Sequence, residues 1–426
     1  MHTLLFLNPG HFHAALTLRE PHPRISEEVY VYAEPGPDLE RFLEIVESFN
    51  RRGDNPTRWR LHTYTGPDCV DKLTEERRGD IVVIAGHNNT KMAAIHRMHR
   101  EGFAVLADKP WLTGTAGIGM LRETLAGAPL AMDIMTTRYE ASFALQYELC
   151  GNPDVFGEVR RPKDGGPKDS APAIELESVH HLYKIVNGVP LVRPPWYFDI
   201  EVQGRGIVDV SSHLVDQAQW LVGRGHPLHP DRNVALVSSR RWPTPVPLEL
   251  YTRITGDRAF PEPAAPFVRD SVLEFDCNGE IRFDLRGVPV LVRVVWNLEP
   301  PPGGADTHRT LLRGTRAEIA IVQGPETGFR DELTVRPVED AAGVAKALER
   351  AIAGWQQRFP GTALVPRGEE LKIHIPDPLR IGHEAQFSLV RDEFLGYVDA
   401  GEWPPDLAAN IVSRYSLIAQ AGESAA

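Results

Sequence analysis

The apolar run 81–85 constrains the fold of this chain more than any other segment. It reads Ile-Val-Val-Ile-Ala and lies between Asp80 and Gly86, so no polar side chain interrupts it. A strand without polar alternation is typical of a parallel sheet that helices cover on both faces. A helix expected over Lys91–Glu101 and a second short apolar strand, Phe103–Ala107, follow directly. This succession predicts an open, parallel α/β sheet.

Other segments in the first third of the chain extend the same pattern. Thr3–Leu7 and Val29–Ala33 are predicted strands, Asp38–Phe49 is a predicted crossover helix, and Leu130–Thr137 is a further strand. Thr57–Tyr64 reads either as a strand or as a connection. We therefore expect a doubly wound, Rossmann-type domain over residues 1–138.

The remainder, residues 139–426, is predicted to form an α+β domain with a large, mainly antiparallel open sheet. Turn signals such as Asn278-Gly279 suggest that hairpins join its strands. We expect amphipathic helices over Ala342–Phe359, His383–Ala400 and Ala408–Gln420, which would cover this sheet or the first domain. The expected strands are Val234–Arg240, Ser271–Asp276, Glu280–Leu285, Pro289–Leu298, Arg309–Arg313, Ala317–Gln323 and Glu332–Pro337. Such a sheet is also a surface for self-association, so we expect a homo-oligomer, either a dimer or a tetramer.

Composition excludes several classes of function. The 426 residues carry a formal net charge of -12, which disfavours a nucleic-acid or anionic-membrane partner. The three cysteines follow no metal-ligand spacing, so neither a disulfide framework nor a metal site is expected. No apolar run is long enough for a membrane span or, at the N-terminus, for a secretory signal. These features fit a cytoplasmic protein.

The loop after the first predicted strand reads Asn8-Pro9-Gly10-His11-Phe12-His13. Strand, tight glycine turn and helix present backbone N–H groups to a phosphate, but only the middle glycine of the GxGxxG fingerprint is kept. Asn8 stands at the first glycine position, where it can still adopt a positive φ. A strand–turn–helix start without a nucleotide explains this motif equally well. Glu34, 24 residues after Gly10, supports the nucleotide, because an acid there accepts ribose hydroxyls and repels the extra phosphate of NADP.

A second polar segment lies between Gly204 and Asp216. If the chain is helical from Ile207, then Asp209, His213 and Asp216 share one face, which would be a titratable stripe on a buried helix. Active sites are where the cost of burying such groups is accepted. The alternative is that Asp209 caps the helix and His213 is a hydrogen-bonded core histidine.

Four motifs in the same order resemble those of the Gfo/Idh/MocA family of glucose-fructose oxidoreductase and inositol dehydrogenase. They are Gly86-His87-Asn88, Gly102-Phe103-Ala104-Val105, Asp108-Lys109-Pro110, and the run from Gly204 to Asp216. The departures are the missing outer glycines, Asp108 for glutamate, His87 for proline, Lys91 for histidine and Ser211 for glycine. The chain is thus similar to a divergent subgroup of that family.

The resemblance implies an NAD(P)-dependent dehydrogenase that acts on the secondary alcohol of a sugar, cyclitol or polyol. By resemblance, His213 would be the acid/base, Asp209 would orient it or bind a hydroxyl, and Lys109 would hold the substrate oxygen near the nicotinamide. NAD is expected over NADP. The residues assigned to the cofactor are Asn8, Gly10, His11, Phe12, Glu34, Gly86, His87, Asn88, Asp108 and Lys109.

The substrate is expected to meet Arg138, His181, Lys184 and Trp196 in addition to Asp209 and His213. His180 and His181 are neighbours on a predicted strand over Ile174–Val186 and should point to opposite faces, so they cannot chelate one metal together.

Two other functions remain open. The same oxidation could be transient and serve to cleave a glycoside by elimination, with NAD held tightly and not consumed. Alternatively, the eroded glycine pattern allows a non-catalytic NAD-binding sensor or subunit of the same fold.

Overall fold

The computed structural model describes residues 1–161, 171–186 and 189–425. The chain forms two compact units, and neither is a single continuous segment. The first unit contains Met1–Thr136, Val202–Gly204 and Gly382–Ser416. The second contains Thr137–Glu201, Arg205–Ile381 and Leu417–Ala426. Each unit has its own main sheet.

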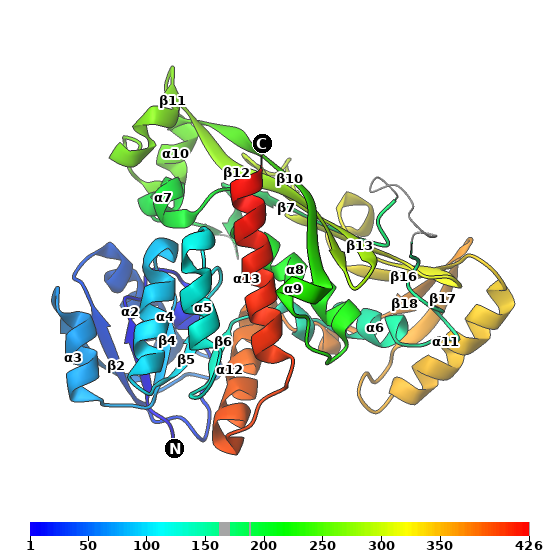
Figure 1. Cartoon of the computed structure of the whole chain (residues 1–426), viewed down its shortest axis with the longest axis horizontal. Coiled ribbons are helices and arrows are strands. Elements are labelled where there is room, and N and C mark those ends of the chain that lie inside the picture. The colour runs from blue at the N-terminus through cyan, green and yellow to red at the C-terminus, as the bar shows by residue number, and fades with distance from the viewer. Residues whose placement is uncertain (162–170, 187–188, 426) are drawn as a thin grey trace. The chain divides into compact units, whose positions relative to one another are not determined.

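The first unit is built on a six-stranded sheet in the order β3-β2-β1-β4-β5-β6 (Figure 1). All neighbouring strands pair in parallel. Every residue of β1, β4 and β5 is buried, which confirms the prediction from their unbroken apolar runs. The strands are β1 (Leu4–Leu7), β2 (Glu28–Ala33), β3 (Arg60–Thr65), β4 (Ile81–Ile84), β5 (Ala104–Ala107) and β6 (Ala131–Asp133).

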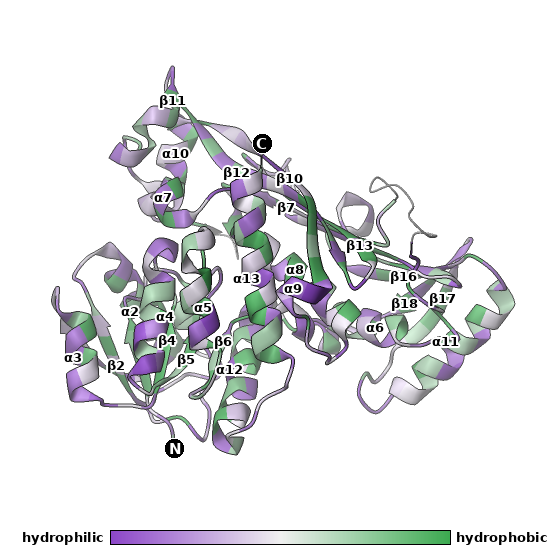
Figure 2. Ribbon diagram, in the orientation of Figure 1, coloured by the Kyte–Doolittle hydropathy of each residue, from purple (hydrophilic) through white to green (hydrophobic). Residues whose placement is uncertain are grey.

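Helices cover this sheet, and Figure 2 shows them with mixed hydrophilic and hydrophobic residues, as expected of covering helices. Helix α1 packs against α2 and α12, and α4 packs against α5. The predicted doubly wound fold of this part is confirmed. The helices are α1 (His13–Leu16), α2 (Pro37–Arg51), α3 (Cys69–Glu76), α4 (Asn88–Arg100), α5 (Ile118–Thr124) and α12 (His383–Ala400).

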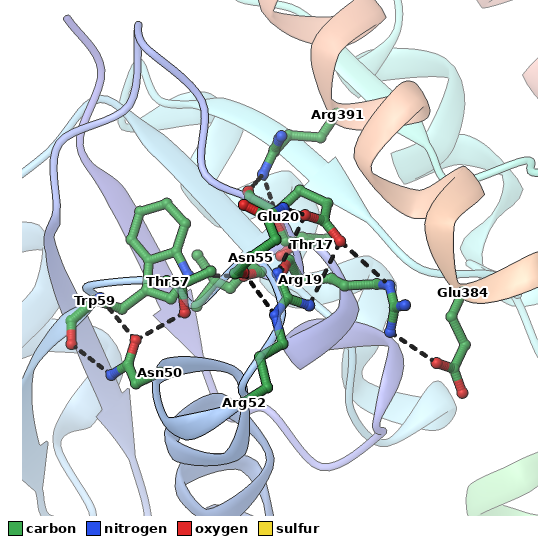
Figure 3. A network of polar contacts seen from close by, with 11 residues as sticks. Thr17, Arg19, Glu20, Asn50, Arg52, Asn55, Thr57, Trp59, Glu384 and Arg391 are labelled. Carbon is green, nitrogen blue, oxygen red and sulfur yellow. Dashed lines mark hydrogen bonds and ion pairs between the residues drawn. The ribbon is translucent and has the colours of Figure 1, made fainter. Parts of the chain in front are cut away.

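Arginine side chains join α12 and α2 to the segment that follows α1 (Figure 3). Arg391, almost fully buried on α12, donates to the carbonyl oxygens of Thr17 and Glu20 at 2.8 and 2.6 Å. Arg52, at the end of α2, donates to the carbonyl of Arg19 at 2.7 Å and to the carboxylate of Glu20. Because these bonds satisfy backbone oxygens that no strand or helix uses, they fix the segment between α1 and β2.

The second unit is built on a large sheet in the order β10-β12-β13-β7-β14-β15-β16-β18-β17. Its pairs are antiparallel except β13 with β7, which run parallel. The predicted mainly antiparallel sheet is thus confirmed. Its strands are β7 (Ile174–His181), β10 (Val234–Pro247), β12 (Val272–Leu285), β13 (Val288–Asn297), β14 (Thr307–Arg313), β15 (Ala317–Gln323), β16 (Glu332–Pro337), β17 (Ala363–Arg367) and β18 (Glu370–His374), with β11 (Val268–Arg269) beside β12 and a small pair, β8 (Ile185–Val186) and β9 (Val189–Pro190).

The hairpin predicted at Asn278-Gly279 is wrong, because both residues lie inside the continuous strand β12. Asn278 uses its amide to donate to Trp242 O and to accept from the Trp296 N–H, beside a register shift between β10 and β12. A Cβ on Gly279 would lie 2.5 Å from the side chain of Ile207. This glycine therefore allows a close backbone approach instead of a turn.

The remaining helices include α11 (Ala341–Trp355), which shows the predicted amphipathic pattern. The others are α6 (Ala141–Cys150), α7 (Ile200–Gln203), α8 (Ser211–Gly223), α9 (Pro230–Asn233), α10 (Leu248–Thr255) and α13 (Leu407–Ser424). Among the described residues, no helix is both long enough and apolar enough to cross a bilayer.

Candidate functional site

The carboxyl ends of β1 and β4 bring two glycine-containing loops together in the first unit. Asn8, directly after β1, has φ +43°, which confirms the positive φ predicted there. A Cβ on Gly86, directly after Ala85, would lie 2.4 Å from Asn8 O, and a Cβ on Gly10 would lie 2.8 Å from Asp38 Oδ2. Gly86 is therefore needed for the close packing of these loops, whereas a Cβ on Gly10 would displace the carboxylate of Asp38. In open α/β sheets, this edge is where ligands bind.

A buried carboxylate connects the first loop to the loop after β5. Asp108 Oδ2 lies 2.8 Å from Nδ1 of His11, and Asp108 Oδ1 lies 3.0 Å from Nδ1 of His13. Since a carboxylate only accepts, each imidazole donates through Nδ1–H. Asp108 Oδ1 also accepts from the Lys109 N–H at 2.8 Å. His13 and Asp108, two of the departures from the Gfo/Idh/MocA pattern, are thus partners of each other.

Both members of this pair have shifted pKa values. Burial raises the pKa of Asp108, but the neighbouring His13 and the hydrogen bonds from both imidazoles outweigh it and hold the pKa well below its usual range. Burial lowers the pKa of His13 well below its usual value, although Asp108 opposes this. We conclude that the centre contains an ionised carboxylate and a neutral His13 at pH 7.

His11, His13 and Asp108 also have the geometry of a possible metal-binding group. Their ligand atoms lie within 4.8 Å of one another, and this is the only such group in the part of the chain that the structure describes. The sequence predicted no metal site because no ligand spacing stood out. Direct hydrogen bonds join Asp108 to each of the two histidines.

Asn88 and Lys109 are connected through a buried lysine. Lys91 Nζ lies 2.7 Å from Asn88 Oδ1 and 3.4 Å from Lys109 O. The amide nitrogen of Asn88 donates to Gln203 O at 2.9 Å. Lys109 itself is only 8% exposed. Protein groups therefore contact both polar atoms of the Asn88 side chain. We expected Asn88 to contact a cofactor, but its side chain organises the loop in which it lies.

Two acids lie near the nucleotide fingerprint. Glu34 is exposed at the end of β2, and its N–H donates to Asn8 Oδ1 at 3.0 Å. Asp38, in the first turn of α2, lies against Gly10, and its carboxylate is 3.4 Å from Nε2 of His87. Asp38 was missed at the sequence level because it reads as an ordinary acid in the first turn of a helix.

In the second unit, α8 begins at Ser211 and not at Ile207, so Asp209 lies in the turn before the helix. The predicted helical face shared by Asp209, His213 and Asp216 is therefore wrong for Asp209. The carbonyl of Asp209 accepts from the Ser212 hydroxyl at 2.6 Å. His213 is half-buried in the first turn of α8, where its neighbours Ser212 and Leu214 are buried.

Arg138 makes a two-point ion pair with Asp216. Its Nε and Nη2 lie 3.0 and 2.6 Å from the two carboxylate oxygens. Asp216 is only 1% exposed, whereas the Arg138 side chain is 33% exposed. Arg138 thus compensates the buried charge of Asp216. The assignment of Arg138 to the substrate did not include this role.

His181 and Lys184 both contact Asp306, which lies in the loop before β14. Asp306 Oδ1 accepts from the His181 backbone N–H at 3.1 Å and lies 3.0 Å from His181 Nδ1. Asp306 Oδ2 accepts from Lys184 Nζ at 2.6 Å and lies 3.2 Å from Nδ1 of His180. Adjacent histidines thus reach one carboxylate because β7 ends at His181. Asp306 was missed, since it follows a Pro/Gly-rich stretch that reads only as a loop.

Aromatic residues lie close to this carboxylate cluster, and the ring of Trp296 is 4.7 Å from that of His180. Trp196 is half-buried, and the neighbouring Tyr197 is buried. The guanidinium of Arg193 lies 4.7 Å from the ring of Tyr197 and 5.1 Å from that of Trp296. Burial, with smaller contributions from Asp209 and Asp306, raises the pKa of Tyr197 although Arg193 opposes the shift.

A surface pocket in the first unit lies away from these loops. It is lined by residues that precede β2 and β3, including Pro21, Pro23, Pro56 and Trp59. These positions are at the amino ends of parallel strands, whereas the polar loops follow the carboxyl ends. We place the candidate site at the carboxyl ends, because the titratable side chains and the closely packed glycines gather there.

Residues 145–426 match the family described as "Putative oxidoreductase C terminal domain". No curated protein matches the chain. Among solved structures, a "putative oxidoreductase" from Parabacteroides merdae is 37% identical with a TM-score of 0.95, and the match covers 100% of this chain and 97% of that one.

More distant structures show the fold alone. The 3-ketoreductase KijD10 from Actinomadura kijaniata, solved with NADP and TDP-benzene, has a TM-score of 0.59 at 15% identity, over 99% of this chain and 97% of that one. GenD2 from gentamicin A biosynthesis, solved with NAD, has a TM-score of 0.55 at 13% identity, over 99% of this chain and 92% of that one.

Proposed function

The chain belongs to the "Putative oxidoreductase C terminal domain" family, and from this premise we propose that it transfers a hydride between NAD and a secondary alcohol of a sugar, cyclitol or polyol derivative. The NADP and NAD complexes of KijD10 and GenD2, which share the fold, support a nicotinamide cofactor. A 3-ketoreductase among these structures supports a carbinol or ketone as the reacting group.

The observation that carries the proposal is the buried Asp108–Lys109 pair at the carboxyl end of β5. Asp108 is connected to the loop after β1, where a dinucleotide phosphate would lie, by the bonds to His11 and His13. Lys109 follows it in the chain and is largely buried. A largely buried ammonium beside a nucleotide loop can stabilise the alkoxide that develops when a hydride leaves a carbinol.

The residues present fit a dinucleotide. Asn8, Gly10 and Gly86 form a tightly packed, glycine-containing edge, and the exposed Glu34 stands where ribose hydroxyls would be accepted. When bound, the nicotinamide supplies the hydride acceptor or donor. We assign the phosphate cradle to the loop 8–13 and the ribose contact to Glu34.

The protein supplies the proton chemistry. Lys109 would hold the substrate oxygen, and His213 would take the hydroxyl proton in oxidation and return it in reduction. Asp209 would bind a neighbouring hydroxyl or orient His213. Lys109 belongs to the first unit and His213 to the second.

The test is NAD reduction, followed at 340 nm, with a panel of sugars and polyols. Lys109→Met and His213→Asn should each lower kcat/KM by about 100-fold or more, as loss of a proton-handling or oxyanion-stabilising group does. Binding of NAD, measured by calorimetry, should be retained. Matched variants of exposed residues, Lys346→Met and His226→Asn, should behave as wild type.

Wild-type rates in both Lys109→Met and His213→Asn would exclude this mechanism. If no member of the panel reduces NAD while the protein binds it, the sensor function is favoured. Release of NAD only on denaturation, together with glycoside cleavage without net reduction, would favour transient oxidation.

We also propose self-association through the large sheet. On β7, buried Ile174 and Leu176 alternate with Glu175 and Glu177, which pair with Arg313 and Arg293 on the neighbouring strands. A face of paired charges suits a symmetric polar interface between two copies. Light scattering coupled to size exclusion should give a dimer or tetramer, and a monomer at 50 µM would contradict this.

A further inference from the structure

Ser178, His180 and Asp306, near the end of β7, form a hydrogen-bonded series of side chains in the second unit. This series is a second arrangement that can handle a proton. Ser178 Oγ lies 2.7 Å from His180 Nε2, and His180 Nδ1 lies 3.2 Å from Asp306 Oδ2. Ser178 and His180 are two residues apart on a strand, so both point to the same face of the sheet. None of the three was assigned a role at the sequence level.

The connectivity determines where His180 carries its proton. The carboxylate of Asp306 only accepts, so Nδ1 of His180 is protonated and Nε2 is the acceptor, towards the Ser178 hydroxyl. Asp306 is itself fixed by Lys184 Nζ and by the His181 N–H. This serine–histidine–aspartate order makes Nε2 a supported base. The His180 side chain is 21% exposed, so a ligand can reach it.

A second imidazole lies beside these three side chains. One of its ring nitrogens has no hydrogen-bond partner among the described residues. His308 on β14 lies directly opposite Ser178 in the antiparallel register. Its Nε2 is buried and has no hydrogen-bond partner among the described residues. Its ring packs against Phe143 at 5.2 Å. Buried polar atoms of this kind usually have a partner, so this nitrogen indicates a ligand or water site next to Ser178 and His180.

The carboxylate of Asp306 and that of Asp209, in the turn before α8, act electrostatically on the same residue of the second unit. Both Asp209 and Asp306 contribute to the raised pKa of the Tyr197 phenol. The ring of Trp296 lies 4.7 Å from that of His180 and 6.1 Å from that of Tyr197. Within the second unit, the rings of His180, Trp296 and Tyr197 therefore form one aromatic cluster.

We propose that His180 is a second base, which removes a proton from the carbon next to the ketone formed by the oxidation. This inference rests on the proposed function, since the ketone is its product. Hydride transfer needs only one proton acceptor, which is His213 in that proposal, and leaves no task for a supported base of this kind. A ketone makes the adjacent C–H bond acidic, and such a bond is a suitable substrate for a second base.

The step balances without a further reagent. The C–H bond breaks, its electron pair forms the carbon–carbon double bond of the enolate, and the carbonyl pair moves onto oxygen. His180 Nε2 takes the proton while Asp306 stabilises the imidazolium through Nδ1–H. The proton then returns to the same carbon or exchanges with solvent. Where a leaving group stands on the next carbon, the enolate can expel it, which is the chemistry of the transient-oxidation reading.

The experiment is hydrogen–deuterium exchange of a keto-sugar in D₂O, followed by proton NMR with the full-length protein. The probes are the ketone of the sugar that the enzyme oxidises fastest and, independently of that result, methyl 3-keto-α-glucoside. Wild type should accelerate exchange next to the carbonyl at least about 100-fold over buffer. His180→Asn should lose at least about 10-fold of this while NAD reduction and the melting temperature stay near wild type.

Two further variants complete the test. His180→Ala should regain exchange when imidazole is added, which a purely structural role would not give. His226→Asn, on the exposed surface, should exchange as wild type. Oxidation without exchange in wild type, or full exchange in His180→Asn, overturns the inference. Exchange of methyl 3-keto-α-glucoside without any NAD reduction would support His180 as a base and contradict the proposed function.

Discussion

Arg138 and Asp216 form a two-point ion pair in which the guanidinium is partly exposed and the carboxylate is buried, with contacts of 3.0 and 2.6 Å. Such pairs are geometrically specific, because both oxygens receive a donor. The arginine is 78 positions away from the aspartate in the chain, so the pair connects the start of the second unit to α8. By holding α8, it also holds the helix that carries His213.

The first prediction follows from the unequal burial of this pair. Arg138→Met should lower the free energy of unfolding by about 2–4 kcal/mol, because it leaves a buried carboxylate without its cation. The double variant Arg138→Met/Asp216→Leu should recover much of this loss. Urea denaturation gives both values. If Arg138→Met is as stable as wild type and only KM rises, then Arg138 serves the substrate and not the fold.

The second prediction concerns cofactor choice. Glu34→Ser should shift the ratio of kcat/KM for NAD over NADP towards NADP by about 10-fold or more, because a carboxylate repels the 2′-phosphate. Asp38→Asn is the matched comparison, since Asp38 lies against Gly10. Kinetics with both nucleotides distinguish the two acids. A larger shift in Asp38→Asn would move the ribose contact from Glu34 to Asp38.

The third prediction tests the partnership of Asp108 with the two histidines. Asp108→Asn should lower the free energy of unfolding by about 1–3 kcal/mol, since an amide cannot accept from both imidazoles and the Lys109 N–H as the carboxylate does. The affinity for NAD should also fall, because the loop after β1 loses the hydrogen bonds of His11 and His13 to the Asp108 carboxylate. Calorimetry and urea denaturation measure the two effects. Unchanged stability and affinity would mean that the loops are held without this carboxylate.

The fourth prediction is a pH dependence. Burial lowers the pKa of His308 to about 4, and the neighbouring His180 adds a smaller contribution in the same direction. The unfolded chain binds a proton at about pH 6.5 and the folded protein only near pH 4, so protonation favours unfolding between these values. Stability should therefore fall as the pH drops from about 6.5 to 4, by up to about 3 kcal/mol from this group.

The variant His308→Leu isolates that contribution. Leucine has no titratable proton, so the decline in stability between pH 6.5 and 4 should be shallower than in wild type. Thermal unfolding at a series of pH values measures it. Parallel curves for the two proteins would show that His308 does not titrate as its burial indicates.

How much could be predicted from the sequence differs between the two sheets. β15 and β16 were expected at their observed bounds, and so was α12, because alternating or helical hydrophobic patterns are local properties. The continuous strand β12 was divided in two by a false turn at Asn278-Gly279. Local turn chemistry cannot show that a glycine serves a distant contact, here with Ile207.

The candidate site shows the same limit. Lys109 and His213 were proposed from motifs, since a short run of residue types in a fixed order is visible in one dimension. The hydrogen bonds of Asp108 to His11 and His13 were not, because the partners are 97 and 95 positions apart. Nor could Asp306 be assigned to His180, which lies 126 positions earlier.

The sequence by itself determined the strands of the parallel sheet except β3, the polar loops that follow them, and the residue types available for chemistry. These depend on side-chain periodicity and on backbone preferences within a few residues. Only the tertiary structure decided which side chains form hydrogen bonds and ion pairs. These interactions require atoms about 3 Å apart, whatever the distance between the residues along the chain. Asp108, Asp216 and Asp306 each contact partners that only folding brings near.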